Sequence, residues 1–216
     1  MVMFTLVFGK LARINSDGVP YAVFCFSALV PWNYFSMGLS SASGSLIGAS
    51  SMISKVYFPR IILPISALLG PIVEFVVSLI VLFGLMFYFD LRFTAAILYL
   101  PLLILIVFLF AGGLGMWLSS IAIQYRDVKH GISFLIRIMM YLSPVIYPYS
   151  LVPDRYKLIY AFNPMVGVIE GFRSALLQTR PMPWVEIGIG LLVSVCFLVS
   201  GAIFFHKSEK IFADVI

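Results

Sequence analysis

The stretch FTAAILYLPLLILIVFLFAGGLGMWLSSIAI, residues 93–123, decides the fold, because it carries no charged side chain. An α-helix rises about 1.5 Å per residue, so about 20 consecutive apolar residues cross the roughly 30 Å hydrocarbon core of a bilayer. The stretch exceeds that length. Pro101 predicts a kink near its start, and the small-residue run AGGLG at 111–115 lies toward its end. We interpret 93–123 as a membrane-spanning helix.

Further charge-poor windows on both sides predict an all-α polytopic membrane protein. Five complete transmembrane helices are expected, at 20–48, 61–89, 93–123, 131–149 and 184–205. The apolar segment 1–9 is too short to span and lacks the basic region of a signal peptide, so we interpret it as the end of a truncated first span. Short re-entrant helices are expected at 150–180, before the last span. Residues 1–216 then form a single transmembrane domain.

The composition excludes the other classes of protein. Hydrophobic residues make up 62% of the chain and charged residues 11%, against roughly 45–50% and 25% in soluble domains. The two cysteines, Cys25 and Cys196, lie in apolar runs, which excludes a disulfide scaffold. The net charge of +5 does not indicate nucleic acid, because the basic residues are scattered singly. The connections expected on one side of the membrane are 10–18, 90–92 and 150–183, and those expected on the other side are 49–60, 124–137 and 206–216. The 14 Lys and Arg residues divide evenly between these two sets, so charge alone gives no orientation.

The long connection before the last span predicts a helix that does not cross the membrane. Asn163 and Pro164 form a helix start, because asparagine can cap and proline suits the first turn. One apolar face follows, made of Met165, Val168, Ile169, Phe172 and Leu176. Glu170 and Arg173 lie on the other side, three residues apart, and can pair. A helix over 164–178 would be only about 22 Å long, so we expect it to be re-entrant or surface-lying, with 153–161 as a candidate partner.

Two short connections between expected spans, 50–60 and 124–130, carry charge. In SSMISKVYFPR, 50–60, apolar residues recur at helical spacing and Pro59 ends the helix. An interfacial turn and a short helix that docks a soluble partner are equally open interpretations. QYRDVKH, 124–130, is either a charge cluster that stops a span or a partner contact in which Arg126 and Asp127 pair.

Two charges fall inside expected spans. Glu74 lies near the middle of one span, and Arg137 lies a short way into another that begins on the same side. Their Cα depths would differ by roughly 9 Å, within combined side-chain reach. Because a lone charge in a bilayer is costly, one prediction is that the two form an ion pair. The alternative is that Arg137 snorkels to the interface and Glu74 is protonated or locally hydrogen-bonded.

The sequence contains no motif typical of catalysis or of metal binding. His130 and His206 stand alone, and Gly9-Lys10 lacks the GxxxxGK[ST] pattern of a phosphate-binding loop. We therefore expect no catalytic residue, no metal ligand and no cofactor in this chain. Any ATP, with its Mg²⁺, would be bound by another chain.

Five ordered motifs give the chain a family resemblance. They are SDGVPYAVFCFSALVPWNYF at 16–35, ISKVYFPRIILP at 53–64, QYRDVKH at 124–130, SPVIYP at 143–148 and NPMVGVIEGFR at 163–173. Over nearly its whole length the chain resembles the integral-membrane permease of ABC-2 type exporters. The similarity is greatest to the subfamily that exports lipid-linked polysaccharides such as the O-antigen of lipopolysaccharide.

The resemblance implies six spans with both termini cytoplasmic, in the bacterial inner (plasma) membrane. It also implies a working unit of two permeases and two ABC ATPase subunits. Docking of the ATPase is implied for Ser54, Lys55, Tyr57, Phe58, Arg60, Arg126 and Asp127. The re-entrant helices of 150–180 would lie at the periplasmic mouth, where the gate residues would be Asn163, Pro164, Glu170 and Arg173.

The implied cargo is a polyprenyl-pyrophosphate-linked glycan, moved when ATP binds to the partner chains. Aromatic rings suit a sliding sugar chain, and the candidates are Trp32, Tyr34, Phe35, Tyr141, Tyr147 and Tyr149. An ordinary interfacial aromatic belt is the alternative. Lys10 and Arg13 are candidate contacts for the lipid headgroup or its pyrophosphate. Two other functions stay open: an ABC-2 permease for teichoic acid, capsule or a drug, and a membrane-embedded glycosyltransferase.

Overall fold

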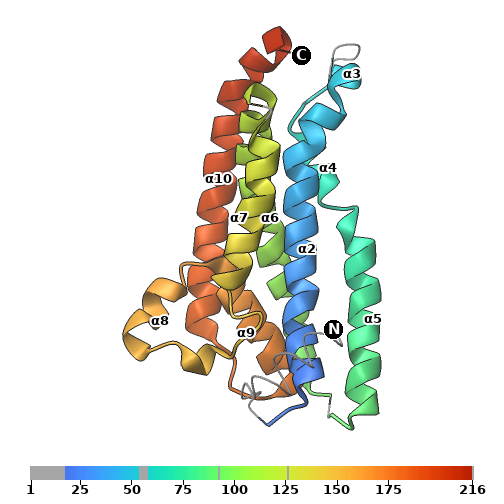
Figure 1. Ribbon diagram of the computed structural model, residues 1–216, viewed down its shortest axis with the longest axis vertical. Coiled ribbons are helices and arrows are strands. Elements are labelled where there is room, and N and C mark those ends of the chain that lie inside the picture. The colour runs from blue at the N-terminus through green and yellow to red at the C-terminus, as the bar shows by residue number, and fades with distance from the viewer. Residues whose placement is uncertain (1–17, 54–57, 92, 126, 216) are drawn as a thin grey trace.

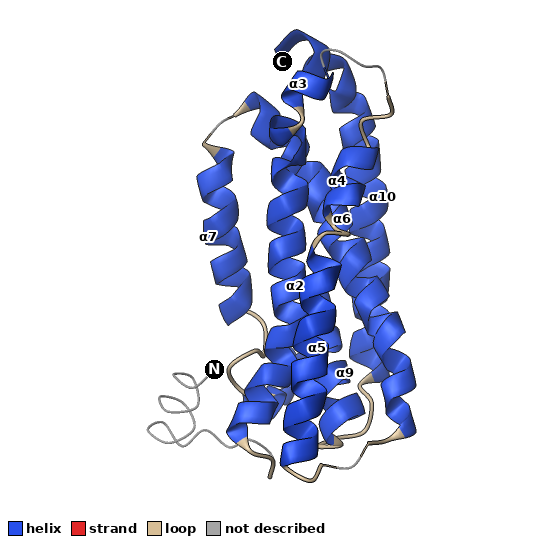
Figure 2. Ribbon diagram, turned by 90° about the vertical axis from the view of Figure 1, so that its right-hand side faces the viewer, coloured by secondary structure: helices blue, strands red, loops and turns tan. Residues whose placement is uncertain are grey.

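The protein is a bundle of long helices that stand side by side (Figure 1, Figure 2). The computed structural model describes residues 18–53, 58–91, 93–125 and 127–215, with the backbone alone for 129, 130 and 210–215. Every regular element in this part of the chain is a helix. The expected all-α class is therefore confirmed, whereas the segment 1–9 lies outside the described residues.

The elements follow one another in a simple order. They are α2 (Tyr21–Gly48), α3 (Ser50–Ile53), α4 (Ile62–Ala67), α5 (Pro71–Tyr88), η2 (Ala95–Tyr99), α6 (Leu100–Gln124), α7 (Val128–Tyr141), η3 (Tyr149–Leu151), α8 (Asp154–Tyr160), α9 (Pro164–Leu177) and α10 (Trp184–Val215). Four helical stretches in the described residues are long and apolar enough to cross a membrane: Tyr21–Gly48, Ile62–Tyr88, Ala95–Gln124 and Trp184–Glu209. These agree with four of the five expected spans.

The fifth expected span, at 131–149, is not one helix. Helix α7 ends at Tyr141, and its 14 residues reach only about 21 Å. The chain continues to Pro148 without regular helix, because Pro144 and Pro148 disfavour the helical conformation of the residues before them. The count of five complete spans is therefore not confirmed, and this return pass combines a short helix with irregular backbone.

Alternating chain direction sorts the connections into two ends of the bundle. The connections after α2 and after α6 lie beside the C-terminus of α10, at the top of Figure 1. We call this the C-terminal end. The connection after α5 and the whole segment from 142 to 183 lie at the other end, which we call the opposite end. The two expected sets of connections are thus separated in space.

Helix α6 is the centre of the bundle, and its small residues let the neighbouring backbones approach. A Cβ atom built on Gly113 would lie 2.5 Å from the backbone of Phe197 and Leu198 in α10, and one on Gly115 would lie 2.6 Å from the Cβ atom of Ala42 in α2. Small residues play this part in membrane helices generally, since apolar burial gives little drive for association in lipid. The run AGGLG is therefore the seam that joins α6 to two neighbours.

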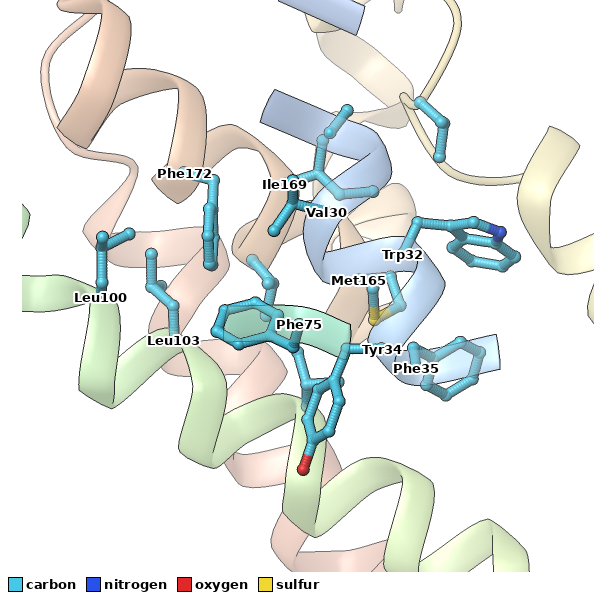
Figure 3. Packing of buried hydrophobic residues seen from close by; sticks show 14 of the residues in the cluster. Val30, Trp32, Tyr34, Phe35, Phe75, Leu100, Leu103, Met165, Ile169 and Phe172 are labelled. Atoms are coloured by element: carbon cyan, nitrogen blue, oxygen red, sulfur yellow. The ribbon is translucent and has the colours of Figure 1, made fainter. Parts of the chain in front are cut away.

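Aromatic and aliphatic side chains fill the space between α2, α5, α6 and α9 (Figure 3). The ring of Phe35 stacks on Phe110 at 5.3 Å between centroids, and Phe75 meets Phe172 edge to face at 6.3 Å. Offset and edge-to-face pairs of this kind stabilise cores beyond their area burial. This cluster fixes α9 against the long helices.

The close approach at Gly113 generates a stability prediction. Gly113→Ala forces α6 away from α10, because the added methyl group meets backbone and not a flexible side chain. Overpacking of this kind costs about 1–3 kcal/mol. Thermal unfolding of the purified protein in detergent measures the loss. The matched control is Gly84→Ala in α5, where nothing lies within 4 Å of the new Cβ atom; equal melting of the two variants would contradict the seam.

Candidate functional site

Helix α9 is the centre of a compact structure at the opposite end of the bundle. The Asn163 side chain accepts a hydrogen bond from the Met165 amide at 3.1 Å, so the predicted cap and helix start are confirmed. All 14 residues of α9 are buried, because α2, α6 and α10 pack around it. The predicted helix exists, but it lies inside protein and not on a surface.

Glu170 and Arg173 form the predicted ion pair, with 2.7 Å between Oε1 and Nη1. The side chains of Glu170 and Arg173 are only 8% and 1% exposed, so the face of α9 opposite its apolar stripe is also covered by protein. The Arg173 guanidinium also lies 3.7 Å from the centroid of the Phe24 ring in α2. Burial of a charge is costly unless it is paired and hydrogen-bonded; here Glu170 of α9 supplies the opposite charge and the Phe24 ring of α2 covers the guanidinium.

The same arginine holds the irregular segment that follows α7. Arg173 Nη2 donates to the carbonyl oxygen of Val145 at 3.0 Å, and Nη1 donates to that of Tyr147 at 3.4 Å. The Tyr21 hydroxyl donates to the Ile146 carbonyl at 3.0 Å. Three successive carbonyl groups of non-helical backbone thereby gain partners. Irregular backbone at membrane depth is tolerated where protein satisfies it in this way.

The helix cap is joined to the same segment. The Asn163 side-chain amide donates to the carbonyl oxygen of Leu142 at 3.2 Å and to the Ser143 hydroxyl at 2.9 Å. One side chain therefore caps α9 and also closes the end of α7. We call the segment 142–149 together with α9 the re-entrant unit.

Tyrosines attach the re-entrant unit to α8 and α10. The Tyr147 and Tyr160 hydroxyls are 2.6 Å apart, and the Tyr149 hydroxyl donates to Glu186 Oε1 at 3.0 Å. Burial, followed by the hydrogen bond to its partner, raises the pKa of Tyr149 and of Tyr160 above the ordinary tyrosine value. Both phenols therefore remain protonated donors at physiological pH. Sequence reasoning missed Tyr160 and Glu186, because only tertiary packing brings them to the segment.

The two charges expected to meet within the spans do not do so. Glu74 is exposed on α5 and Arg137 is exposed on α7, and the ion pairs of the described residues do not include one between them. The two helices flank different sides of α2 (Figure 2). The predicted ion pair within one chain is therefore wrong. Among the described residues, no group of three His, Cys, Asp or Glu side chains is placed to hold a metal ion.

Residues 1–177 match the family of ABC-2 type transporters. The chain belongs to this family. It is 28% identical to the O-antigen export system permease protein RfbA of Myxococcus xanthus, over 100% of this chain and 83% of the relative. Two proteins of the same name from Klebsiella pneumoniae are 23% and 24% identical, over 100% of this chain and 82% of each relative. The chain is a multi-pass membrane permease, a transport subunit.

The implied docking residues of this ABC-2 permease are only partly described. Ser54, Lys55, Tyr57 and Arg126 lie outside the described residues, as do Lys10 and Arg13. Asp127 is exposed at the start of α7. Phe58 is half-buried against the cluster around Leu46. The Arg60 side chain donates to the Glu209 carbonyl oxygen at 2.8 Å, which ties the start of α4 to the end of α10.

Five of the six aromatic residues expected along the path are held by protein contacts. Trp32, Tyr34 and Phe35 are at most 3% exposed, so in this conformation they have no face open to a sugar. Tyr34 packs on Phe75 of α5 and Phe35 packs on Phe110 of α6. Trp32 packs on Phe35, and Figure 3 shows these two rings pointing away from Phe75. Tyr147 and Tyr149 fasten the re-entrant unit, as described above. Tyr141, at the end of α7, is 64% exposed.

The buried arginine generates the second prediction. Arg173→Met leaves a carboxylate and two carbonyl groups without their donor, and removing one partner of a buried pair costs about 3–5 kcal/mol. Glu170→Gln costs less, because Arg173 keeps its carbonyl partners. The double variant E170M/R173M melts above Arg173→Met alone, since the isolated acid is gone. Thermal unfolding checks the order, and an Arg173→Met protein as stable as the parent would refute this role.

Proposed function

We propose that this permease exports a lipid-linked, O-antigen-type polysaccharide across the bacterial inner membrane. One observation carries the proposal: three relatives matched over the whole of this chain are all named O-antigen export system permeases. The four apolar spanning stretches fit a subunit embedded in a bilayer. The polyprenyl-pyrophosphate carrier of the glycan belongs to the proposal.

The working unit proposed is a homodimer of this chain with two ABC ATPase subunits. The sequence has no phosphate-binding loop of its own, so ATP and Mg²⁺ would be bound by the partner. The C-terminal end of the bundle supports a docking role, because the start of α4, the start of α7 and the end of α10 lie together there (Figure 1). We propose that the ATPase engages 54–60 and 126–127.

In this scheme the re-entrant unit forms the wall of the periplasmic mouth. The hydrogen bonds made by Arg173 and Asn163 support this assignment, because they join α9 to the segment after α7 in one body. A displacement of α7 at the C-terminal end would therefore reach the mouth without unravelling the irregular backbone between them. Movement of the two would be coupled through these bonds.

Complementation tests the proposed function. A Gram-negative strain that lacks its own O-antigen permease would receive this chain together with a partner ABC ATPase. We expect surface O-antigen, detected by antibody on intact cells, to be restored. The matched control carries the same permease with an ATPase whose phosphate-loop lysine is replaced. Lipid-linked glycan that stays inside the cell with the intact pair would contradict the proposal, and restored export of teichoic acid or a drug instead would assign another cargo.

A further inference from the structure

A pocket lies between the short helix α8 and helices α6, α7 and α10. It has a volume of about 470 Å³, and we call it the α8 pocket. Figure 1 shows α8 standing out to one side of the long helices, at the opposite end of the bundle. The wall of the pocket is almost wholly apolar, and its main side chains are Phe110, Met139, Leu142, Ile159, Phe162 and Phe197.

The described part of the chain leaves this apolar wall open to its surroundings. No residue of α8 is buried. Ile159 on α8 and Phe162 just after it are 69% and 59% exposed. The polar groups of the wall are already engaged, since the Asn163 amide donates to Leu142 and Ser143 and the Tyr160 hydroxyl bonds to Tyr147. A concave apolar surface of this kind is typical of a site for an apolar ligand.

The depth of the α8 pocket matches one leaflet of a bilayer. Phe110 follows Leu100, the first residue of α6, by 10 positions. Phe197 follows Trp184, the first residue of α10, by 13 positions. At about 1.5 Å per residue, the two rings lie about 15 and 20 Å from the opposite end, near the middle of a roughly 30 Å hydrocarbon core. They pack edge to face at 5.5 Å and form the inner wall. The pocket therefore extends over the depth that one acyl chain occupies.

A cation lies beside the mouth of the pocket. The Arg155 guanidinium carbon is 4.5 Å from the centroid of the Tyr156 ring, and Tyr156 lines the pocket. The ion pairs of the described residues do not include Arg155, whereas its neighbours Asp154 and Lys157 pair with each other at 2.5 Å. No acid lines the pocket. Helix α8 thus presents one unbalanced positive charge next to an apolar hollow.

We propose that the α8 pocket binds an anionic phospholipid of the surrounding membrane, with one acyl chain inside and the phosphate on Arg155. A guanidinium matches the geometry of phosphate oxygens, and the apolar wall matches the chain. The bound lipid is a structural partner and not the cargo. It fastens α8, which packs only loosely on the other helices, to α7 and α10. The inference does not depend on which substrate the permease moves.

Photo-crosslinking locates the acyl chain. The full-length permease is placed in nanodiscs that contain phosphatidylglycerol with a diazirine at the end of one acyl chain. After irradiation, peptide mass spectrometry should find adducts around Phe110 and Phe197. Ile159→Trp fills the pocket and should reduce these adducts several-fold. Leu158→Trp is the matched control, because Leu158 is also exposed on α8 but does not line the pocket. Equal adducts in the two variants would overturn the inference.

The charge is tested separately, which keeps the inference falsifiable if Ile159→Trp does not accumulate. Arg155→Gln should weaken the binding of phosphatidylglycerol about fivefold, the effect of one cation near an anionic lipid surface. Arg155→Lys should restore most of it. The control D154N/K157Q removes a neutral pair from the same helix and should bind like the parent. Native mass spectrometry of the permease with added lipid measures the bound fraction, and unchanged binding by Arg155→Gln would refute the proposed headgroup contact.

Two other occupants give distinct results. If polyprenyl phosphate displaces the photoreactive lipid at lower concentration than phosphatidylglycerol does, the pocket belongs to the carrier of the cargo. If Ile159→Cys in a C25A/C196A permease cross-links to another copy and the lipid adducts are absent, a second copy covers the pocket. Either result overturns the inference and leaves the proposed function standing.

Discussion

The bonds from Arg173 to the carbonyls of Val145 and Tyr147 are the interaction on which this structure depends. A chain that leaves helical geometry inside a membrane must find partners for its carbonyl groups within the protein. Here two prolines end α7 early, and a buried arginine from α9 supplies the missing donors. Glu170 makes that arginine tolerable in turn. The burial of α9 therefore follows from the irregular segment after α7, whose carbonyl groups need the Arg173 donors.

This arrangement divides the bundle into parts with different physical character. The seam at Gly113 and Gly115 holds α6 rigidly against α10 and α2, and the re-entrant unit adds a hydrogen-bonded cap at one end. Helix α7 packs against α2 and α6, and within the described part of the chain Ser40, Ser41 and Ser133 beside this contact are exposed. A rigidly packed body beside a less covered helix is compatible with the homodimer proposed above.

The sequence predicted what depends on local pattern and missed what depends on packing. Four spans followed from uninterrupted apolar length, and the start of α9 followed from Asn163 and Pro164. The early end of α7 was readable from Pro144 and Pro148, but the hydrophobicity of 131–149 concealed it. The burial of Arg173 could not be predicted, because periodicity shows which residues share a face and not what covers that face. The same limit applies to the aromatic residues of α2, which are buried, whereas Ser40 and Ser41 of the same helix are exposed.

Hydrogen–deuterium exchange of the permease in lipid nanodiscs tests most directly the central claim that α9 holds the irregular segment. The segments to compare are 143–149 and 178–183, since both are largely non-helical and lie at the same end of the bundle. The first is mostly buried and bonded to α9, whereas the second is exposed or half-buried. The account predicts slow exchange in 143–149, close to that of α6, and fast exchange in 178–183. Equally fast exchange in both segments would contradict it.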